Sequence, residues 1–473
     1  MHLAAVFGWL IEGLDVELAF IESEIDSEIY MTLPKGATQT STDSKRAAVV
    51  VRLLRSLYGL KQAGELWYTR VKSILLSDGY TCLKHDKCIF IKRDNETGEV
   101  TIVICYVDDV LYIGNSHSQI TQSINHFRKN VTAITTMGNV TRYIGIDITR
   151  NLTEHTIALS QTPYIDRFVT SNIPHDSNPK STPMSDSVDY SKMTVETEIE
   201  KSIQPEVGQL RYLADHTKPD ILTAVGLLGQ AAAQPHQMHH KGIKHLARYL
   251  KGSRDIPLIL GGTDEDINLF GYADASHLPD KTSKPRLGFC FFLNLHSGTI
   301  YARSVKSTNV SHSSCEAEIN VIDAAAIRTI WIRGLLAELG YPQLTPTVIY
   351  TDSLSAKALA DACQIGNNSA HITMRINFLH EQVTGKVIEL KFINTENEVA
   401  DVLTKLLPVE SHRRHSEILL LGHKGIPPVI IRKADRLTMV PKPSMFKFDK
   451  NTNKFKHKLQ AAKAKLKQKV RIS

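Results

Sequence analysis

Two adjacent aspartates, Asp108 and Asp109, lie between two apolar runs of the chain. The runs, residues 101–105 and 110–114, contain β-branched side chains, and this pattern predicts two strands joined as a hairpin. Because neighbouring carboxylates repel each other, a nearby cation stabilises the pair. Mg²⁺ prefers carboxylate oxygens together with substrate phosphates. We expect a metal-binding hairpin here and not a solvated turn, because a metal site needs the rigid support that flanking strands give.

A third carboxylate, Asp15, lies inside the apolar stretch of residues 13–21. An isolated acid is costly to bury, so Asp15 is expected to have a partner. With Asp108 and Asp109 it would form a cluster able to bind two Mg²⁺ ions. Two ions roughly 3.5–4 Å apart can activate a 3′-hydroxyl and stabilise a departing pyrophosphate.

Four segments of the chain resemble, in order, the catalytic blocks of copia-type (Ty/copia) retrotransposon reverse transcriptases. They are residues 15–36, residues 53–68, Tyr106 to Asp109, and residues 143–146. The resemblance implies that Asp15, Asp108 and Asp109 are the catalytic, metal-binding residues of a polymerase palm.

The same resemblance implies nucleotide-binding roles for three further residues. Phe20 falls where the family has an aromatic that crowds the sugar 2′-position and favours deoxynucleotides. Gln62 would lie near the incoming nucleotide or template, and Tyr106 near the primer end. Without the family context, Phe20 would be read as an ordinary core residue.

Residues 266–406 alternate between strand and helix patterns, as in a mixed α/β sheet. Acids at strand ends and helix starts converge on one edge of such a sheet. The acids concerned are Asp274, Glu318, Asp352 and Asp401. Such a four-carboxylate, two-magnesium site can hydrolyse phosphodiesters.

These four acids also resemble the catalytic acids of the ribonuclease H fold. Glu318 is preferred over Glu316 because the family's acid directly precedes an aliphatic residue. The predicted elements are strands at 269–276, 288–295, 348–353 and 387–393, and helices at 313–340, from 355 and from 397.

The fold class that follows is α/β: an α+β polymerase palm lacking most of the fingers, followed by a ribonuclease H-like mixed α/β domain. The predicted domains are 1–150 (palm), 151–265 (thumb or connection), 266–406 (ribonuclease H-like) and 407–473 (basic tail). The polar segment 149–205 predicts long loops, and residues 206–252 predict helices.

Three histidines, His236, His239 and His240, have the i, i+3, i+4 spacing of one helix face. No acid or cysteine nearby completes a metal site, so the sequence favours a solvent-facing basic helix over a metal centre.

The composition is that of a globular protein of two or three domains, with 473 residues of which 42% are hydrophobic. Six scattered cysteines without a C-x-x-C pair indicate a reducing, intracellular setting. No apolar run is long enough to predict a transmembrane segment. We expect the cytoplasm, in the context of a virus-like particle, with the nucleus as the alternative. The oligomeric state stays open.

The net charge of +7 is concentrated at the C-terminal end, where residues 424–473 contain 15 lysines and arginines against two acids. Residues 454–470 have apolar side chains at helical spacing. Such a tail attracts nucleic acid through its phosphates. An import signal, an anionic membrane surface or a simply solvated tail fits the same composition.

Two departures from the family pattern bear on activity. The chain begins just upstream of Asp15, so the fingers that hold the triphosphate have no counterpart. The chain also has Glu17-Leu18 where the family usually has Lys-Thr, and Gly64-Glu65 where it has Pro-Arg, so both changes replace positive charge with negative. Phosphoryl transfer depends on positioning and charge neutralisation. We therefore expect a truncated element protein that uses Mg²⁺, with Mn²⁺ as the alternative ion.

The expected partners are an RNA/DNA hybrid, a template RNA and a primer. Ribonuclease H cleavage is expected to survive, and RNA-directed DNA synthesis to be impaired. The alternative hypothesis, from another functional class, is a catalytically inactive nucleic-acid-binding relic of a transposon.

Overall fold

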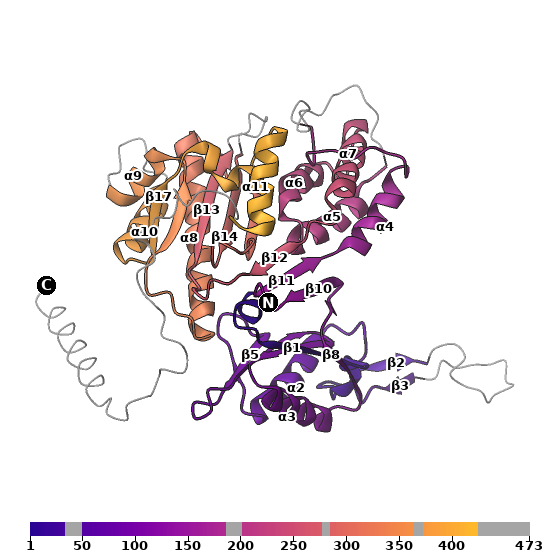
Figure 1. Cartoon of the computed structure of the whole chain (residues 1–473). Helices are drawn as coiled ribbons and strands as arrows, with labels where there is room; N and C mark the ends of the chain where they lie inside the picture. The colour runs from indigo at the N-terminus through magenta and orange to yellow at the C-terminus, as the bar shows by residue number, and fades with distance from the viewer. Residues whose placement is uncertain (34–49, 186–200, 277–283, 363–371, 424–473) are drawn as a thin grey trace, which may run out of the picture.

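The computed structural model describes residues 1–33, 50–185, 201–276, 284–362 and 372–423. Figure 1 shows a lower lobe built from the N-terminal residues and an upper part in which two further groups of elements lie beside each other. The fold is mixed α/β, as the sequence predicted. Of the predicted basic tail, residues 424–473, which include the lysine-rich segment 454–470, lie outside the described residues.

The lower lobe is built on an antiparallel sheet in which chain segments far apart in sequence are neighbours. Its strand order is β4-β5-β6-β7-β1-β8. The strands are β1 (Leu10–Val16), β4 (Thr81–Cys82), β5 (Ile89–Arg93), β6 (Val100–Tyr106), β7 (Asp109–Gly114) and β8 (Ile134–Asn139). We call this lobe the palm.

Helices α2 (Ala63–Ser77) and α3 (His117–Asn130) share one apolar core with the palm sheet. The short turn η1 (Ala19–Glu22) packs near α2. A separate hairpin of β2 (Tyr30–Thr32) and β3 (Val50–Arg52) projects from the palm at the right of Figure 1.

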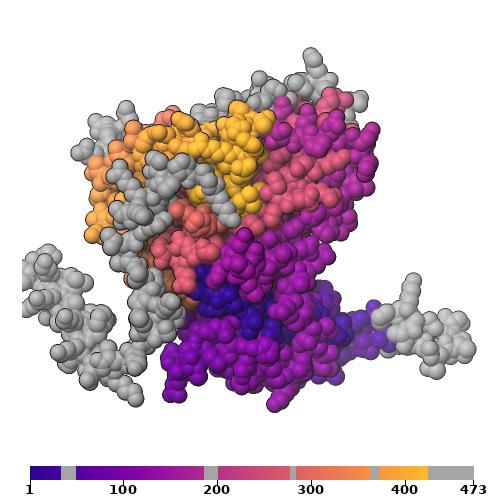
Figure 2. Space-filling model, in the orientation of Figure 1, coloured from indigo at the N-terminus to yellow at the C-terminus, as the bar shows by residue number. Residues whose placement is uncertain are grey.

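A second antiparallel sheet, of order β12-β11-β10-β9, connects the palm to the rest of the molecule. Its strands are β9 (Arg142–Tyr143), β10 (Ile146–Asn151), β11 (Thr156–Ser160) and β12 (Leu258–Gly261). Helix α1 (His2–Val6) packs on β11 and β12. In Figure 2 the indigo N-terminal residues accordingly lie between the two halves of the molecule.

The prediction of long loops over 149–205 was therefore wrong for part of that segment. Strand β11 and helix α4 (Thr162–Asn172) lie inside it. Strand β11 pairs with its sequence neighbour β10 and also with β12, about a hundred residues later in the chain.

Helices follow over 206–252, as predicted. They are α5 (Gln204–His216), η2 (Pro219–Ile221), α6 (Leu222–Gln230) and α7 (Gln237–Ser253). The prediction that these histidines face solvent was wrong, because His236 and His239 are buried. The backbone N–H of His236 donates to Nδ1 of His239 at the start of α7, so these histidines cap the helix.

The third sheet has the order β15-β14-β13-β16-β17, with β13, β16 and β17 parallel. Its strands are β13 (Phe270–Ser276), β14 (Arg286–Phe292), β15 (Tyr301–Lys306), β16 (Thr347–Thr351) and β17 (Ile388–Phe392). Helices α8 (Ser314–Glu338), α9 (Leu354–Ala362) and α10 (Thr373–Thr384) pack with it. We call this unit the nuclease lobe, after the ribonuclease H-like domain that the sequence predicts here.

The prediction of a helix from residue 397 was wrong. The segment instead forms the 3₁₀ turns η4 (Thr395–Asn397) and η5 (Val399–Leu403), and helix α11 (Val409–Leu421) begins later. Residues of η5 are buried against β13 and β14, and that packing favours a tight turn over a regular helix.

Strand β10 crosses the predicted domain limit at residue 150, and α11, which lies beyond the predicted limit at 406, packs on η5, η2 and β12. The four-domain division stays a prediction. Among the described residues, we find no helix with both the length and the apolar character needed to cross a membrane.

Candidate active sites

The palm hairpin brings its acids together through strand pairing. Strands β6 and β7 are antiparallel, and Asp109 pairs with Tyr106 across the turn. Strand β1 lies on the other side of β7, where Asp15 pairs with Asp109. The N–H of Val16 also donates to the carbonyl oxygen of Asp108 at 2.9 Å. Sheet register thus places Asp15 beside the aspartate pair.

The palm carboxylates influence each other electrostatically. Burial and then the charge of Asp108 raise the pKa of both Asp15 and Asp109. Even so, in the described structure these three acids do not form a triad with one oxygen each all within 4.8 Å of one another. The structure brings the predicted polymerase acids to one place without closing them around a single point.

The turn itself is strained and is supported from α2. Val107 has φ of 55°, which a β-branched residue rarely adopts. The indole Nε1 of the buried Trp67 donates to the carbonyl oxygen of Val107 at 2.5 Å. Trp67 therefore holds the backbone that presents Asp108.

The three predicted nucleotide-binding residues lie around this hairpin with different environments. Phe20 is partly buried, and its ring centroid is 4.6 Å from that of Tyr58. Gln62 lies directly before α2 and donates to the Ser27 hydroxyl at 3.3 Å. Tyr106 is exposed.

Tyr58, which the sequence reasoning did not single out, faces the same acids. Burial and then the charges of Asp108 and Asp15 raise the pKa of its hydroxyl. The signal available in the sequence was its place directly before Gly59, whose φ of 99° makes the turn.

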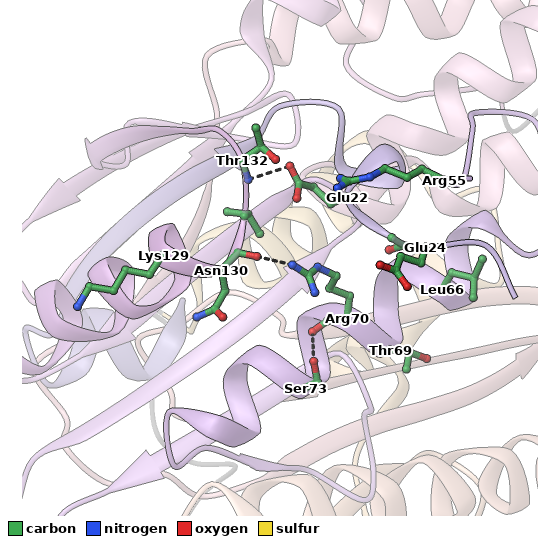
Figure 3. A pocket seen from close by; sticks show the side chains of 12 residues that line it. Glu22, Glu24, Arg55, Leu66, Thr69, Arg70, Ser73, Lys129, Asn130 and Thr132 are labelled. Atoms are coloured by element: carbon green, nitrogen blue, oxygen red, sulfur yellow. Dashed lines mark hydrogen bonds between the residues drawn. The ribbon is translucent and has the colours of Figure 1, made fainter. Parts of the chain in front are cut away.

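A polar pocket of about 570 Å³ lies elsewhere on the palm, between η1, α2 and the end of α3 (Figure 3). Glu22 accepts from the N–H of Thr132 at 2.8 Å, and Arg70 donates to the carbonyl oxygen of Asn130 at 2.7 Å. None of the predicted palm acids lines this pocket. These hydrogen bonds join α2 to the end of α3, and η1 to the segment that follows α3.

Three of the four predicted nuclease acids meet at one point. Single carboxylate oxygens of Asp274, Glu318 and Asp352 all lie within 4.8 Å of one another, and no other His, Cys, Asp or Glu triad in the described ranges does so. Asp274 lies near the end of β13, and Asp352 directly follows β16. Because β13 and β16 are parallel neighbours, their carboxyl ends reach the same edge.

Helix α8 supplies the third acid. Glu318 lies in its first turns, and Oε1 is 3.4 Å from the donating N–H of Ala275. Glu316, the alternative weighed from the sequence, instead accepts from the N–H of His312 at 2.6 Å and helps to cap α8. The structure thus places Glu318, and not Glu316, in the cluster.

Asp401, the fourth predicted acid, lies beside this group but is paired with a lysine. Its Oδ1 is 2.6 Å from Nζ of Lys405, and the same ammonium is 3.3 Å from Oδ1 of Asp274. The Thr404 hydroxyl donates to the other oxygen of Asp274. Gly288 lies opposite Asp274, where a Cβ would collide with Thr404, so glycine permits this approach.

The cluster holds more negative charge than its one lysine balances. Burial and then the charges of Asp274 and Asp352 raise the pKa of Glu318 to about 9. Burial and then Asp274 raise the pKa of Asp401 to about 7. The fully buried Glu398, which sequence reasoning missed, has its pKa raised well above the usual range by burial and then by Asp274.

The residues of the cluster suit a divalent cation. Oε2 of Glu318 is buried and has no hydrogen-bond partner among the described residues. The donors are all carboxylate oxygens, which hard divalent ions prefer. Such an ion would supply the positive charge that the buried acids lack.

Known proteins resemble the chain over most of its length. Residues 1–186 match the family model described as reverse transcriptase (RNA-dependent DNA polymerase). The chain is 31% identical over 416 residues to the retrovirus-related Pol polyprotein from transposon TNT 1-94 of Nicotiana tabacum, a match covering 86% of this chain and 30% of the relative. The corresponding polyprotein from transposon RE1 of Arabidopsis thaliana is 30% identical over 407 residues, covering 84% and 26%.

The chain is related to copia-type retrotransposon Pol polyproteins. The chain spans less than a third of the length of these two curated relatives. Among solved structures, it is similar to the foamy viral protease-reverse transcriptase in complex with RNA/DNA hybrid. That likeness has a TM-score of 0.47 at 14% identity and covers 86% of this chain and 47% of the other.

The site residues that the sequence analysis did not single out bind or flank the predicted acids. Thr404 and Lys405 follow Asp401 by three and four residues, a spacing that could have pointed to them. The Thr395 hydroxyl donates to Oδ2 of Asp352 at 2.7 Å, a contact between distant segments that no local pattern reveals.

Proposed function

We propose that the chain cleaves RNA in RNA/DNA hybrids at the cluster of Asp274, Glu318 and Asp352, using Mg²⁺. The observation that carries this proposal is the meeting of three carboxylates at one edge of the nuclease-lobe sheet. The relationship to copia-type Pol polyproteins supports it. An RNA/DNA hybrid is the proposed substrate.

The chain's own residues hold and orient the acids. The Thr404 hydroxyl fixes Asp274, and the Thr395 hydroxyl fixes Asp352. Glu318 is held on α8 with one free oxygen directed at a buried site. A bound divalent ion supplies charge neutralisation for the scissile phosphate and a water of lowered pKa.

We propose RNA-directed DNA synthesis as a second activity, at the palm acids Asp15, Asp108 and Asp109. Template RNA and primer are the proposed partners there, and Phe20, Gln62 and Tyr106 the proposed nucleotide contacts. Matching of residues 1–186 to the reverse transcriptase family supports this assignment. Synthesis is expected to be weaker than cleavage, because Glu17 and Glu65 bring negative charge close to a polyanionic substrate.

A single incubation tests both activities. Purified chain, Mg²⁺ and an end-labelled RNA/DNA hybrid with a recessed primer end report RNA cleavage and primer extension together. Asp352→Asn should abolish cleavage and Asp108→Asn should abolish extension. Asp361→Asn, at an exposed ion pair on α9, is the matched control and should change neither.

Each outcome has a distinct meaning. If the Asp352→Asn variant still cleaves the hybrid, the cleavage comes from a contaminant, and the nuclease proposal is refuted. Binding of the hybrid with neither activity, from a folded preparation, would instead support a catalytically inactive nucleic-acid-binding relic.

A further inference from the structure

Lys405 bridges Asp274, a member of the nuclease cluster, and the neighbouring Asp401. Its ammonium lies 2.6 Å from Asp401 and 3.3 Å from Asp274. These acids come from different elements, β13 and η5, so one lysine joins the end of a central strand to the turn that packs on it. The contact is thus part of the cluster and not a surface ion pair.

The lysine is fixed in this position by its surroundings. Its N–H donates to the carbonyl oxygen of Asp401 at 2.9 Å, which makes one helical turn between the two residues. Its side chain is 35% exposed, whereas those of Asp274 and Asp401 are 1% and 8% exposed. Burial alone would lower the pKa of Lys405, but Asp274 and Asp401 raise it above its usual value.

The oxygens of Asp274 are divided between two roles. Oδ2 accepts from the Thr404 hydroxyl, and Oδ1 faces the Lys405 ammonium. Oε2 of Glu318, by contrast, is buried and has no hydrogen-bond partner among the described residues. A divalent ion therefore finds a free ligand at the Asp274, Glu318 and Asp352 group, whereas Asp401 already has its counter-charge.

We propose that the Lys405 ammonium takes the place of a second divalent cation, so that the nuclease cluster binds one ion. A tethered ammonium neutralises Asp401 and one side of Asp274 permanently. This inference deepens the proposed nuclease function, on which it rests for its ligand class. It differs from the two-ion site that the sequence alone suggested.

Counting bound Mn²⁺ by electron paramagnetic resonance titration and by calorimetry tests the proposal without any need for turnover. Lys405→Met keeps the length of the side chain and removes its charge. It is expected to bind one more ion per chain than the unaltered protein. Lys405→Arg keeps a cation and should bind the same number as the unaltered protein.

Two further variants make the test specific. Asp401→Asn in the Lys405→Met background should return the count to the original number, because it removes the carboxylate that the extra ion uses. Lys357→Met, at the exposed pair with Asp361, is the matched control and should leave the count unchanged. Thermal unfolding of each variant shows that it is folded before ions are counted.

Equal counts for the unaltered protein and folded Lys405→Met would overturn the proposal, whichever number they share. Failure of this inference is separate from failure of the proposed function. If the chain does not cleave the hybrid, the number of bound ions is still measured. If Lys405→Met does not change that number, the result for hybrid cleavage is unaffected.

Discussion

The Glu338 carboxylate, at the end of α8, lies 3.2 Å from Nδ1 of His85 in the palm. The same carboxylate accepts from the backbone N–H groups of Lys84 and His85, at 2.8 and 3.3 Å. Burial opposes these contacts, but the hydrogen bonds lower the pKa of Glu338 overall. Indole Nε1 of Trp331 completes the contact by donating to the carbonyl oxygen of His85. The helix that carries Glu318 is thus fastened to the palm at its other end.

Glu338→Ala should loosen the palm from the nuclease lobe. We expect hybrid cleavage to continue, but with RNA fragments spread over a wider range of lengths from the primer end, because the two sites are no longer held at a fixed separation. The loss of stability should be about 1 kcal/mol, since the carboxylate is partly exposed. Fragment sizing on a sequencing gel measures the spread. Glu154→Gln, on an exposed turn, is the control, and an unchanged fragment pattern in Glu338→Ala would refute the expectation.

Trp67→Phe should reduce primer extension by roughly ten-fold while leaving hybrid cleavage unchanged. The substitution removes the donor to the Val107 carbonyl oxygen, and the strained turn that presents Asp108 then loses its support. A ten-fold loss of rate corresponds to about 1.4 kcal/mol of lost transition-state stabilisation. Trp331→Phe removes a comparable indole donor far from the hairpin and should leave extension intact. Equal loss of extension in both variants would count against the turn as the cause.

Asp220→Asn should destabilise the chain by about 3–5 kcal/mol, because it leaves a buried lysine without a counter-charge. Asp220 lies 3.7 Å from Nζ of Lys218, and both side chains are at most 1% exposed. Tyr249 also donates to Asp220 at 2.6 Å. Urea unfolding measures the change. The control is Asp215→Asn, which breaks the exposed pair with Arg211 and should cost less than about 1 kcal/mol.

Stability should fall as the pH falls below about 6, in part because His2 is buried in its neutral form. Burial lowers the pKa of His2 from 6.5 to about 3. Between these values the unfolded chain binds the proton and the folded chain does not, so stability rises with pH across that window. One such group changes the free energy of unfolding by about 1.4 kcal/mol per pH unit.

Thermal unfolding from pH 4 to pH 7 checks this expectation. His2→Asn keeps an acceptor for the N–H of Gly261, which now donates to Nδ1 of His2, and should flatten the dependence on pH. His117→Asn, an exposed histidine on α3, serves as the control. A slope that His2→Asn leaves unchanged would assign the pH dependence to other groups.

Local patterns predicted the parts of the fold in which a single segment decides its own structure. The hairpin at Asp108, the strand ending at Asp274 and the long helix α8 each carry their signal in consecutive residues. Residues 156–160 pair with the adjacent β10 and also with the distant β12, and residues 399–403 tighten into η5 against the distant β13 and β14. Such contacts leave no periodicity to detect.

The same distinction applies to the candidate sites. Glu318 could be chosen from the residue that follows it, whereas the Lys405 bridge to Asp274 joins positions 131 residues apart. His236 and His239 were misjudged because helical spacing says which residues share a face but not what covers that face.

One apolar core is continuous from the palm to the nuclease lobe. It contains Ile11 and Ile113 of the palm strands, Leu260 of the connecting sheet, and Ile319 and Ala325 of α8. Unfolding of the two lobes is therefore expected to be cooperative, with a shared transition. A lineage that ceased to use the palm for synthesis would still be under selection to keep its packing, because the nuclease helix depends on it. If one activity were lost, substitutions would then be expected first at the exposed acids and last in the shared apolar core.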